Sequence, residues 1–180
     1  MSHICLAAGA SAALHKACDL ASKLTQRGHQ VRTLLTKNAA RLVNPQLFEA
    51  VSGEPAWVDE FASERRGAMD HITLADWGEL LIVAPASADL VGRLANGLAD
   101  DLVSTVALAL DAGCPRLVSP AMNPTMLANP AVQRNLTRLV EDGWTLVEPG
   151  VGHMACGDDG AGRLPDPAEL VACVESALAG

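Results

Sequence analysis

The fold of this chain is decided by residues 79–96, which read ELLIVAPASADLVGRLAN. After the leading glutamate, the segment ELLIVA is apolar without polar alternation, as in strands of a parallel sheet covered by helices on both faces. A turn of small residues, Pro85-Ala86-Ser87, follows, and a helix is expected over about residues 87–96. An apolar strand that passes through a short turn into a helix predicts an α/β fold.

The same alternation of strand and helix extends over the rest of the chain. Further strands are expected at HICLAA (3–8), QVRTLLT (30–36), PRLVS (115–119) and WTLVE (144–148). Helices are expected over about residues 11–27, 38–43 and 100–110, after Pro45, after an N-cap at Asn129, and from Asp166. Segments 52–67 and 149–165 carry turn residues and predict exposed, irregular chain. We therefore predict a single domain, residues 1–180, with one doubly wound parallel sheet.

The composition is that of a folded, acidic protein. Of 180 residues, 49% are hydrophobic and 19% are charged, which is enough apolar surface for a sizeable core. The formal net charge of -8 at pH 7 argues against binding to nucleic acid, which needs a basic face. It is compatible with a small anionic ligand, because N–H groups at a helix N-terminus can hold phosphate without net positive charge.

The cysteines and the apolar runs indicate a cytoplasmic protein without a membrane partner. Apolar runs end well before the roughly 18 residues that a membrane helix needs, and MSHICLAAG at the N-terminus lacks the basic region of a signal peptide. The five cysteines show no CxxC pair and no metal-ligand spacing, so we expect reduced thiols and no bound metal. They are Cys5, Cys18, Cys114, Cys156 and Cys173.

Small or polar residues follow four of the expected strands. These positions are Gly9-Ala10-Ser11, Thr36, residues 85–89 and residues 119–123. In open α/β sheets a ligand binds beyond the carboxyl ends of the strands, so we expect the site there. The turn after the first strand keeps only Gly9 of the GxGxxG pattern, which counts against a dinucleotide. For each turn taken alone, the alternative is that small residues simply reverse the chain.

Three longer blocks carry a family resemblance. They are PASADLVGRLANGLADDLVSTVALAL (85–110), SPAMNPTMLANPAVQRNL (119–136) and HMACGDDGAGRLPDP (153–167). In this order, together with HITLADW (71–77) and the N-terminal block, they resemble the flavin-containing cysteine decarboxylases over nearly the whole chain. The resemblance implies a Rossmann-like flavoprotein fold that binds FMN at a subunit interface of a homo-oligomer, either a trimer or a trimer-based dodecamer.

The resemblance also implies a role for individual residues. The phosphate end of FMN is expected at Gly9, Ser11, Thr36, Ser104 and Thr105, and its ring at Pro85, Ala86, Ser87, Asp89, Ala121 and Met122. His71 is expected to be the base, offered from a neighbouring subunit, although a histidine before a strand is more often structural. Asn123 is expected to bind the substrate carboxylate, with helix capping as the alternative role. Cys156 is expected on a flap over the substrate, where it donates a proton.

The activity implied by the resemblance is decarboxylation of 4'-phosphopantothenoylcysteine to 4'-phosphopantetheine in coenzyme A biosynthesis. The cysteine thiol end is first oxidised by FMN, CO2 is then lost, and the enethiol is finally reduced. The common bacterial form is fused to a phosphopantothenate–cysteine ligase, and no such domain follows Gly180, so a separate ligase is an expected partner. The first alternative is a peptidyl-cysteine decarboxylase of peptide natural-product maturation. A flavin prenyltransferase resembles the N-terminal turn but not the blocks 119–136 and 153–167. Non-catalytic regulatory relatives keep the fold but tend to add long acidic tails, which we do not find in this sequence.

Overall fold

A six-stranded parallel sheet forms the centre of the computed structural model, which describes residues 1–61, 69–153, 157 and 159–180. In the described residues the strand order is β3-β2-β1-β4-β5-β6, and each neighbouring pair is parallel. The strands are β1 (His3–Ala8), β2 (Gln30–Leu35), β3 (Ala56–Trp57), β4 (Leu80–Ala86), β5 (Arg116–Pro120) and β6 (Thr145–Leu146). The order reverses between β1 and β4, which is where such sheets bind ligands. The predicted doubly wound parallel sheet is confirmed.

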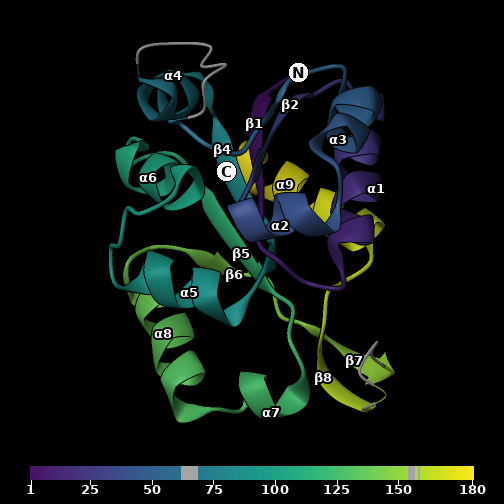
Figure 1. The fold of residues 1–180 in the computed structure, drawn as a ribbon, viewed down its shortest axis with the longest axis vertical. Coiled ribbons are helices and arrows are strands. Elements are labelled where there is room, and N and C mark those ends of the chain that lie inside the picture. Colours follow the sequence, from purple (N-terminus) through teal and green to yellow (C-terminus); the bar gives the residue numbers. More distant parts are fainter. Residues whose placement is uncertain (62–68, 154–156, 158) are drawn as a thin grey trace.

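Helices cover both faces of this sheet (Figure 1). On one side α1 (Leu14–Gln26) packs against both α3 (Pro45–Ser52) and α9 (Pro167–Ala179). On the other side α4 (Asp70–Trp77) packs against α6 (Leu102–Ala109), and α5 (Ala88–Ala95) packs against α8 (Pro130–Glu141). Two separate clusters of buried apolar side chains result, and every residue of β4 is buried between them. This explains why the β4 segment is apolar without alternation.

The starts of several helices are encoded by side chains that accept a backbone hydrogen bond. Thr36 accepts from the Ala39 N–H at the start of α2 (Lys37–Leu42), at 3.1 Å. Ser87 accepts from the Leu90 N–H of α5 at 3.3 Å. The predicted N-cap Asn129 is confirmed, because its Oδ1 accepts from the Ala131 N–H of α8. Such caps satisfy the first N–H groups of a helix, which have no partner inside it.

The structure differs from the sequence prediction in two segments expected to be irregular. Segment 52–67 contains β3, the edge strand of the sheet. Segment 149–165 contains an antiparallel hairpin of β7 (Gly150–His153) and β8 (Asp159–Arg163). Glycine is depleted in strands because it has no side chain to pack. The many glycines of the hairpin therefore give its two segments a low strand propensity, and the sequence predicts a loop instead. A short helix, α7 (Pro124–Leu127), also went unpredicted.

Of the cysteines that the structure describes, Cys5 and Cys18 are buried, and Cys114 and Cys173 are partly buried. Cys5, Cys18, Cys114 and Cys173 are free thiols. Burial raises the pKa of Cys5 to about 12 and the pKa of Cys18 to about 11, so both are protonated at neutral pH. In the part of the chain that the structure covers, no helix combines the length and the apolar character needed to cross a bilayer. Nor do three or more His, Cys, Asp or Glu side chains gather there as a metal-ligand set would.

Candidate active site

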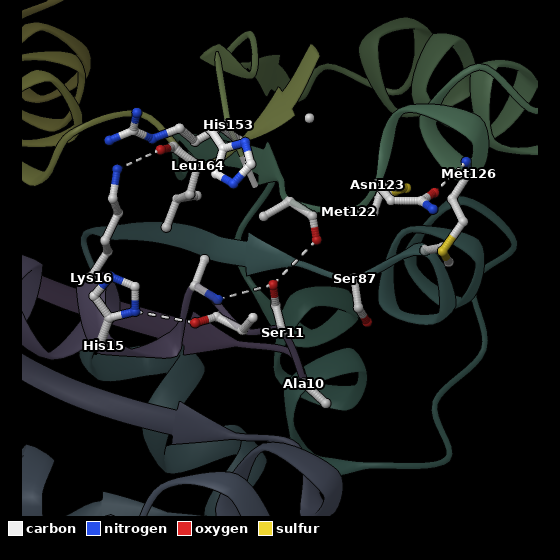
Figure 2. A pocket seen from close by; sticks show the side chains of 16 residues that line it. Ala10, Ser11, His15, Lys16, Ser87, Met122, Asn123, Met126, His153 and Leu164 are labelled. Carbon is white, nitrogen blue, oxygen red and sulfur yellow. Dashed lines mark hydrogen bonds between the residues drawn. The ribbon is translucent and has the colours of Figure 1, made fainter. Parts of the chain in front are cut away.

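A pocket of about 520 Å³ opens beyond the carboxyl ends of β1, β4 and β5 (Figure 2). This volume lies within the roughly 300–1,000 Å³ typical of sites for small molecules and cofactors. Its walls come from the turn after β1 and the first turn of α1, the start of α5, the segment after β5, and the β7–β8 hairpin. The pocket therefore lies where the strand order reverses, at the edge of the sheet predicted to bind a ligand.

Backbone and hydroxyl hydrogen bonds tie the strand ends around the pocket together. The Gly9 N–H donates to the carbonyl of Pro85 at 2.8 Å, which joins the turns after β1 and β4. The Ser11 hydroxyl donates to the carbonyl of Ala121 at 3.3 Å and accepts from the Ala13 N–H at 3.3 Å. Through these bonds the ends of β1, β4 and β5 are held as one surface.

Glycine is required at position 9 because the two turns approach so closely. A Cβ at Gly9 would lie 3.1 Å from both the backbone nitrogen and the Oγ of Ser87. We expect Gly9→Ala to lower the free energy of unfolding by about 1–3 kcal/mol through overpacking. The matched control is Gly92→Ala inside α5, where the nearest atom, Asn135 Nδ2, is 3.6 Å away. There alanine raises the free energy of unfolding by about 0.5–1 kcal/mol, because it favours the helix. Urea unfolding of both variants checks the pair, and changes of equal sign would contradict this account.

The residues present suit a phosphorylated flavin. Small side chains, among them Ala10, Ala12 and Ala88, line the pocket and leave room for a flat ring. The Ser11 and Ser87 hydroxyls also line it, and Ser87 caps α5 at this edge. Hydroxyls and first-turn N–H groups are donors that phosphate and ribityl oxygens accept from.

The cofactor residues predicted from the sequence divide into three groups. Ser11, Ser87, Ala121 and Met122 line the pocket. Gly9, Pro85 and Ala86 lie in the joined strand ends, and Thr36 lies at the end of β2, outside the lining. Asp89, Ser104 and Thr105 also lie outside the lining. Asp89 pairs with Arg93, and both hydroxyls bond to Asp101. Ser104 instead faces a second cavity of about 290 Å³.

Asn123 lies in the pocket and also caps a helix. Its Oδ1 accepts from the Met126 N–H of α7 at 2.8 Å (Figure 2). The side-chain oxygen therefore has the capping role that was the alternative to carboxylate binding. The Nδ2 group carries the two donors of the side chain, which are what a carboxylate needs. Capping fixes the orientation of the amide, so the two roles are compatible.

His71 and Cys156 are not brought to this pocket by the described chain. His71 lies in the first turn of α4 rather than in a turn before a strand, and Figure 1 shows α4 at the opposite end of the molecule from α7 and the hairpin. Its Nδ1 pairs with Glu60 Oε1, and the Glu60 side chain is 13% exposed. Cys156 lies outside the described residues.

Several pocket residues went unpredicted or had only weak claims from the sequence. They are His15, Lys16, Met126, His153, Gly162, Arg163 and Leu164. The hairpin and the residue after it bring the last four to the pocket, because the Met122 N–H donates to the carbonyl of Gly162 at 3.1 Å. The available signal was the basic residues of the block 153–167 and of the first turn of α1. Only the tertiary structure places the two groups together.

A family model, a curated relative and solved structures all match this chain over nearly its whole length. A model of the flavoprotein family matches residues 1–179. The chain is 43% identical over 176 residues to the coenzyme A biosynthesis bifunctional protein CoaBC of Bacillus subtilis (strain 168). That match covers 98% of this chain and 42% of the relative. The chain thus spans about two fifths of the length of the curated relatives it matches.

Two solved structures share the whole fold. One is a PPC decarboxylase mutant complexed with pantothenoylaminoethenethiol, with a TM-score of 0.85, 31% sequence identity and coverage of 99% of both chains. The other is the FMN-dependent cysteine decarboxylase SpaF, with a TM-score of 0.84 and 28% identity. That match covers 100% of this chain and 98% of SpaF.

Proposed function

This chain belongs to the flavoprotein family, and we propose that it is an FMN-dependent decarboxylase that converts 4'-phosphopantothenoylcysteine to 4'-phosphopantetheine in coenzyme A biosynthesis. The observation that carries this proposal is the pocket where the strand order reverses, with Asn123 and small flavin-compatible residues in its walls. The similarity to CoaBC and to PPC decarboxylase supports the substrate. The peptidyl-cysteine alternative has weaker support, since the identity is 43% to CoaBC and 22% to the peptidyl-cysteine decarboxylase EpiD.

The chemistry needs an electron sink. A carboxylate on a carbon bonded to an amide nitrogen does not leave as CO2, because the electron pair has no acceptor. Oxidation of the neighbouring thiol end to a thioaldehyde creates a thiocarbonyl β to the carboxylate, which accepts that pair. FMN, when bound, supplies a two-electron acceptor for the oxidation and a donor for the later reduction. Ser11, Ser87, Ala121 and Met122 are the residues that would hold it in this pocket.

Asn123 holds the departing group. Its Nδ2 donors can hydrogen-bond to a carboxylate without adding a full positive charge. A cation at this position would stabilise the carboxylate more than the neutral CO2 that it becomes. A neutral amide therefore fixes the carboxylate without opposing its loss.

His71 takes the thiol proton, and it does so in the pocket of a neighbouring copy. Three apolar side chains close to it in sequence are exposed: Phe61 at 82%, Met69 at 57% and Ile72 at 38%. Exposed apolar side chains that gather in one region are typical of a protein–protein interface. The Glu60 carboxylate accepts from Nδ1–H, which leaves Nε2 as the free base. We propose a trimer-based assembly, and light scattering that gives a single 18.7 kDa chain would contradict it.

The experiment that tests this function is direct. Protein purified with FMN is incubated with 4'-phosphopantothenoylcysteine, and a peptide with a C-terminal cysteine serves as the competing substrate. We expect the mass of 4'-phosphopantetheine from the first substrate and no change in the second. Turnover of the peptide alone, or of neither substrate by protein loaded with FMN, would overturn the proposal.

A further inference from the structure

The pocket is basic although the chain is acidic. The sequence has 21 Asp and Glu residues against 13 Lys and Arg. Four of the described residues that line the pocket nevertheless carry basic side chains, His15, Lys16, His153 and Arg163, and none of those described lining residues is acidic. This charge distribution indicates that the ligand of the pocket is an anion.

Two of the four basic side chains are engaged within the fold. The Lys16 ammonium donates to the carbonyls of Leu164 and Pro165, at 2.8 and 3.4 Å, and to Asp166 at 2.8 Å. This hydrogen bond holds the pKa of Asp166 below its usual value, so the carboxylate stays charged. Three acceptors use all three donors of an ammonium group. His153 pairs with Asp159 at 3.3 Å and is mostly exposed. Lys16 therefore anchors the segment that directly follows the hairpin, and neither side chain is the best candidate for a ligand.

Arg163 keeps donors available for a ligand. Its guanidinium lies 3.8 Å from Asp166 Oδ1, which is longer than a hydrogen bond, and its side chain is 48% exposed. It extends across Gly152 of β7, where an added Cβ would lie 3.5 Å from Nη1. The planar guanidinium suits phosphate, because it donates two parallel hydrogen bonds.

His15 also lines the pocket and can contribute to binding of an anion. Its Nδ1 lies 3.1 Å from the carbonyl of Ala12, and a carbonyl only accepts, so Nδ1 carries the proton in this contact. Protonation of the ring would then add a donor at Nε2. The ring lines the same pocket as Arg163, so Nε2 is the nitrogen that can face a phosphate oxygen.

The pocket has two chemically different ends. Figure 2 shows Asn123 and Met126 at one end and His15, Lys16 and His153 toward the other. The substrate of the proposed function also has two chemically different ends, with its carboxylate and thiol at one end and its phosphate at the other. We propose, resting on that function, that Arg163, assisted by His15, binds the substrate phosphate and gives the enzyme its preference for the phosphorylated substrate.

The test compares two substrates that differ only in the phosphate. FMN-loaded wild type and Arg163→Gln are each assayed with 4'-phosphopantothenoylcysteine and with pantothenoylcysteine, and the ratio of the two kcat/KM values is the readout. We expect Arg163→Gln to lower this ratio by about 10- to 100-fold, as for a lost hydrogen bond between charged groups. The kcat/KM for pantothenoylcysteine should stay within about twofold. His15→Gln should lower the ratio less, and Arg163→Lys should restore part of it. Arg134→Gln, an exposed arginine of α8 outside the pocket, should leave it unchanged.

FMN also carries a phosphate, so flavin affinity is measured on the same variants. Wild-type affinity for FMN in Arg163→Gln, together with a reduced substrate ratio, supports the substrate phosphate. A loss of FMN affinity with an unchanged ratio would assign Arg163 to the cofactor and overturn the inference. An unchanged ratio at full FMN affinity would also overturn it, while leaving the proposed function standing. No turnover of either substrate by the wild type would overturn both.

Discussion

Replacing His71 with asparagine is expected to lower kcat by about 10²- to 10⁴-fold, the usual contribution of a general base. Asparagine is polar and similar in size, but it cannot take up a proton at neutral pH. FMN content should remain that of the wild type, because the ring is proposed to act on the substrate and not to hold the flavin. Steady-state turnover and the flavin absorbance of the purified variant measure the two effects. Loss of the flavin would assign a structural role to His71 instead.

Mixed assemblies make this prediction more specific. In the proposed two-chain site, Asn123 of one copy is combined with His71 of another. Assemblies reconstituted from His71→Asn and Asn123→Ala subunits should therefore regain turnover, since some of their sites keep both wild-type residues. The kcat of Glu60→Gln is compared with that of His71→Asn as the milder of the two changes. Its amide still accepts from Nδ1–H but lacks the charge that stabilises a protonated ring, so we expect a smaller loss of kcat than in His71→Asn. Mixtures as inactive as their parents would place both residues in one chain.

Replacing Cys156 with serine is expected to separate the two halves of the reaction. Loss of CO2 needs no proton from a thiol, whereas reduction of the enethiolate does, and a serine hydroxyl is a far weaker acid. The variant should release CO2 and accumulate a product two hydrogens lighter than 4'-phosphopantetheine. The yield of saturated product should fall by about 10²-fold or more. Mass spectrometry of the products reports both quantities.

The control for this variant is another cysteine that the proposed reaction does not use. Cys173 of α9 is a free, partly buried thiol outside the pocket, so Cys173→Ser should give the wild-type product ratio. A normal yield of saturated product from Cys156→Ser would remove the proposed proton donor. The oxidative half of the mechanism would be unaffected by that result.

Those parts of the fold that depend on local chemistry could be predicted from the sequence. The β4 segment is apolar because both of its faces are covered, and Thr36, Ser87 and Asn129 mark helix starts with side chains that can cap. The position of the pocket follows too, because carboxyl ends of parallel strands meet at one edge. The β7–β8 hairpin could not be predicted, since its glycines pack against distant segments. One example is Gly160, where an added Cβ would lie 2.9 Å from Pro124.

The residues of the candidate site also divide into those that the sequence could predict and those that it could not. Ser11, Ser87 and Asn123 follow strands in the sequence and lie in the pocket, as expected. His15 and Arg163 reach it only because α1 and the hairpin meet through Lys16 and the carbonyls of residues 164 and 165, a contact almost 150 residues apart in sequence. His71 lies outside the pocket of its own chain, and its proposed role in the pocket of a second copy rests on the family resemblance.

The way the hairpin and the residues after it are attached has a consequence for their sequence. Three attachments of the hairpin and of the two residues after it, from the Met122 N–H and from Lys16, end on main-chain carbonyls of residues 162, 164 and 165. Any amino acid supplies a carbonyl, so the side chains of this segment can be exchanged while the attachments persist. The sequence of this segment can therefore change without loss of these attachments to the rest of the fold.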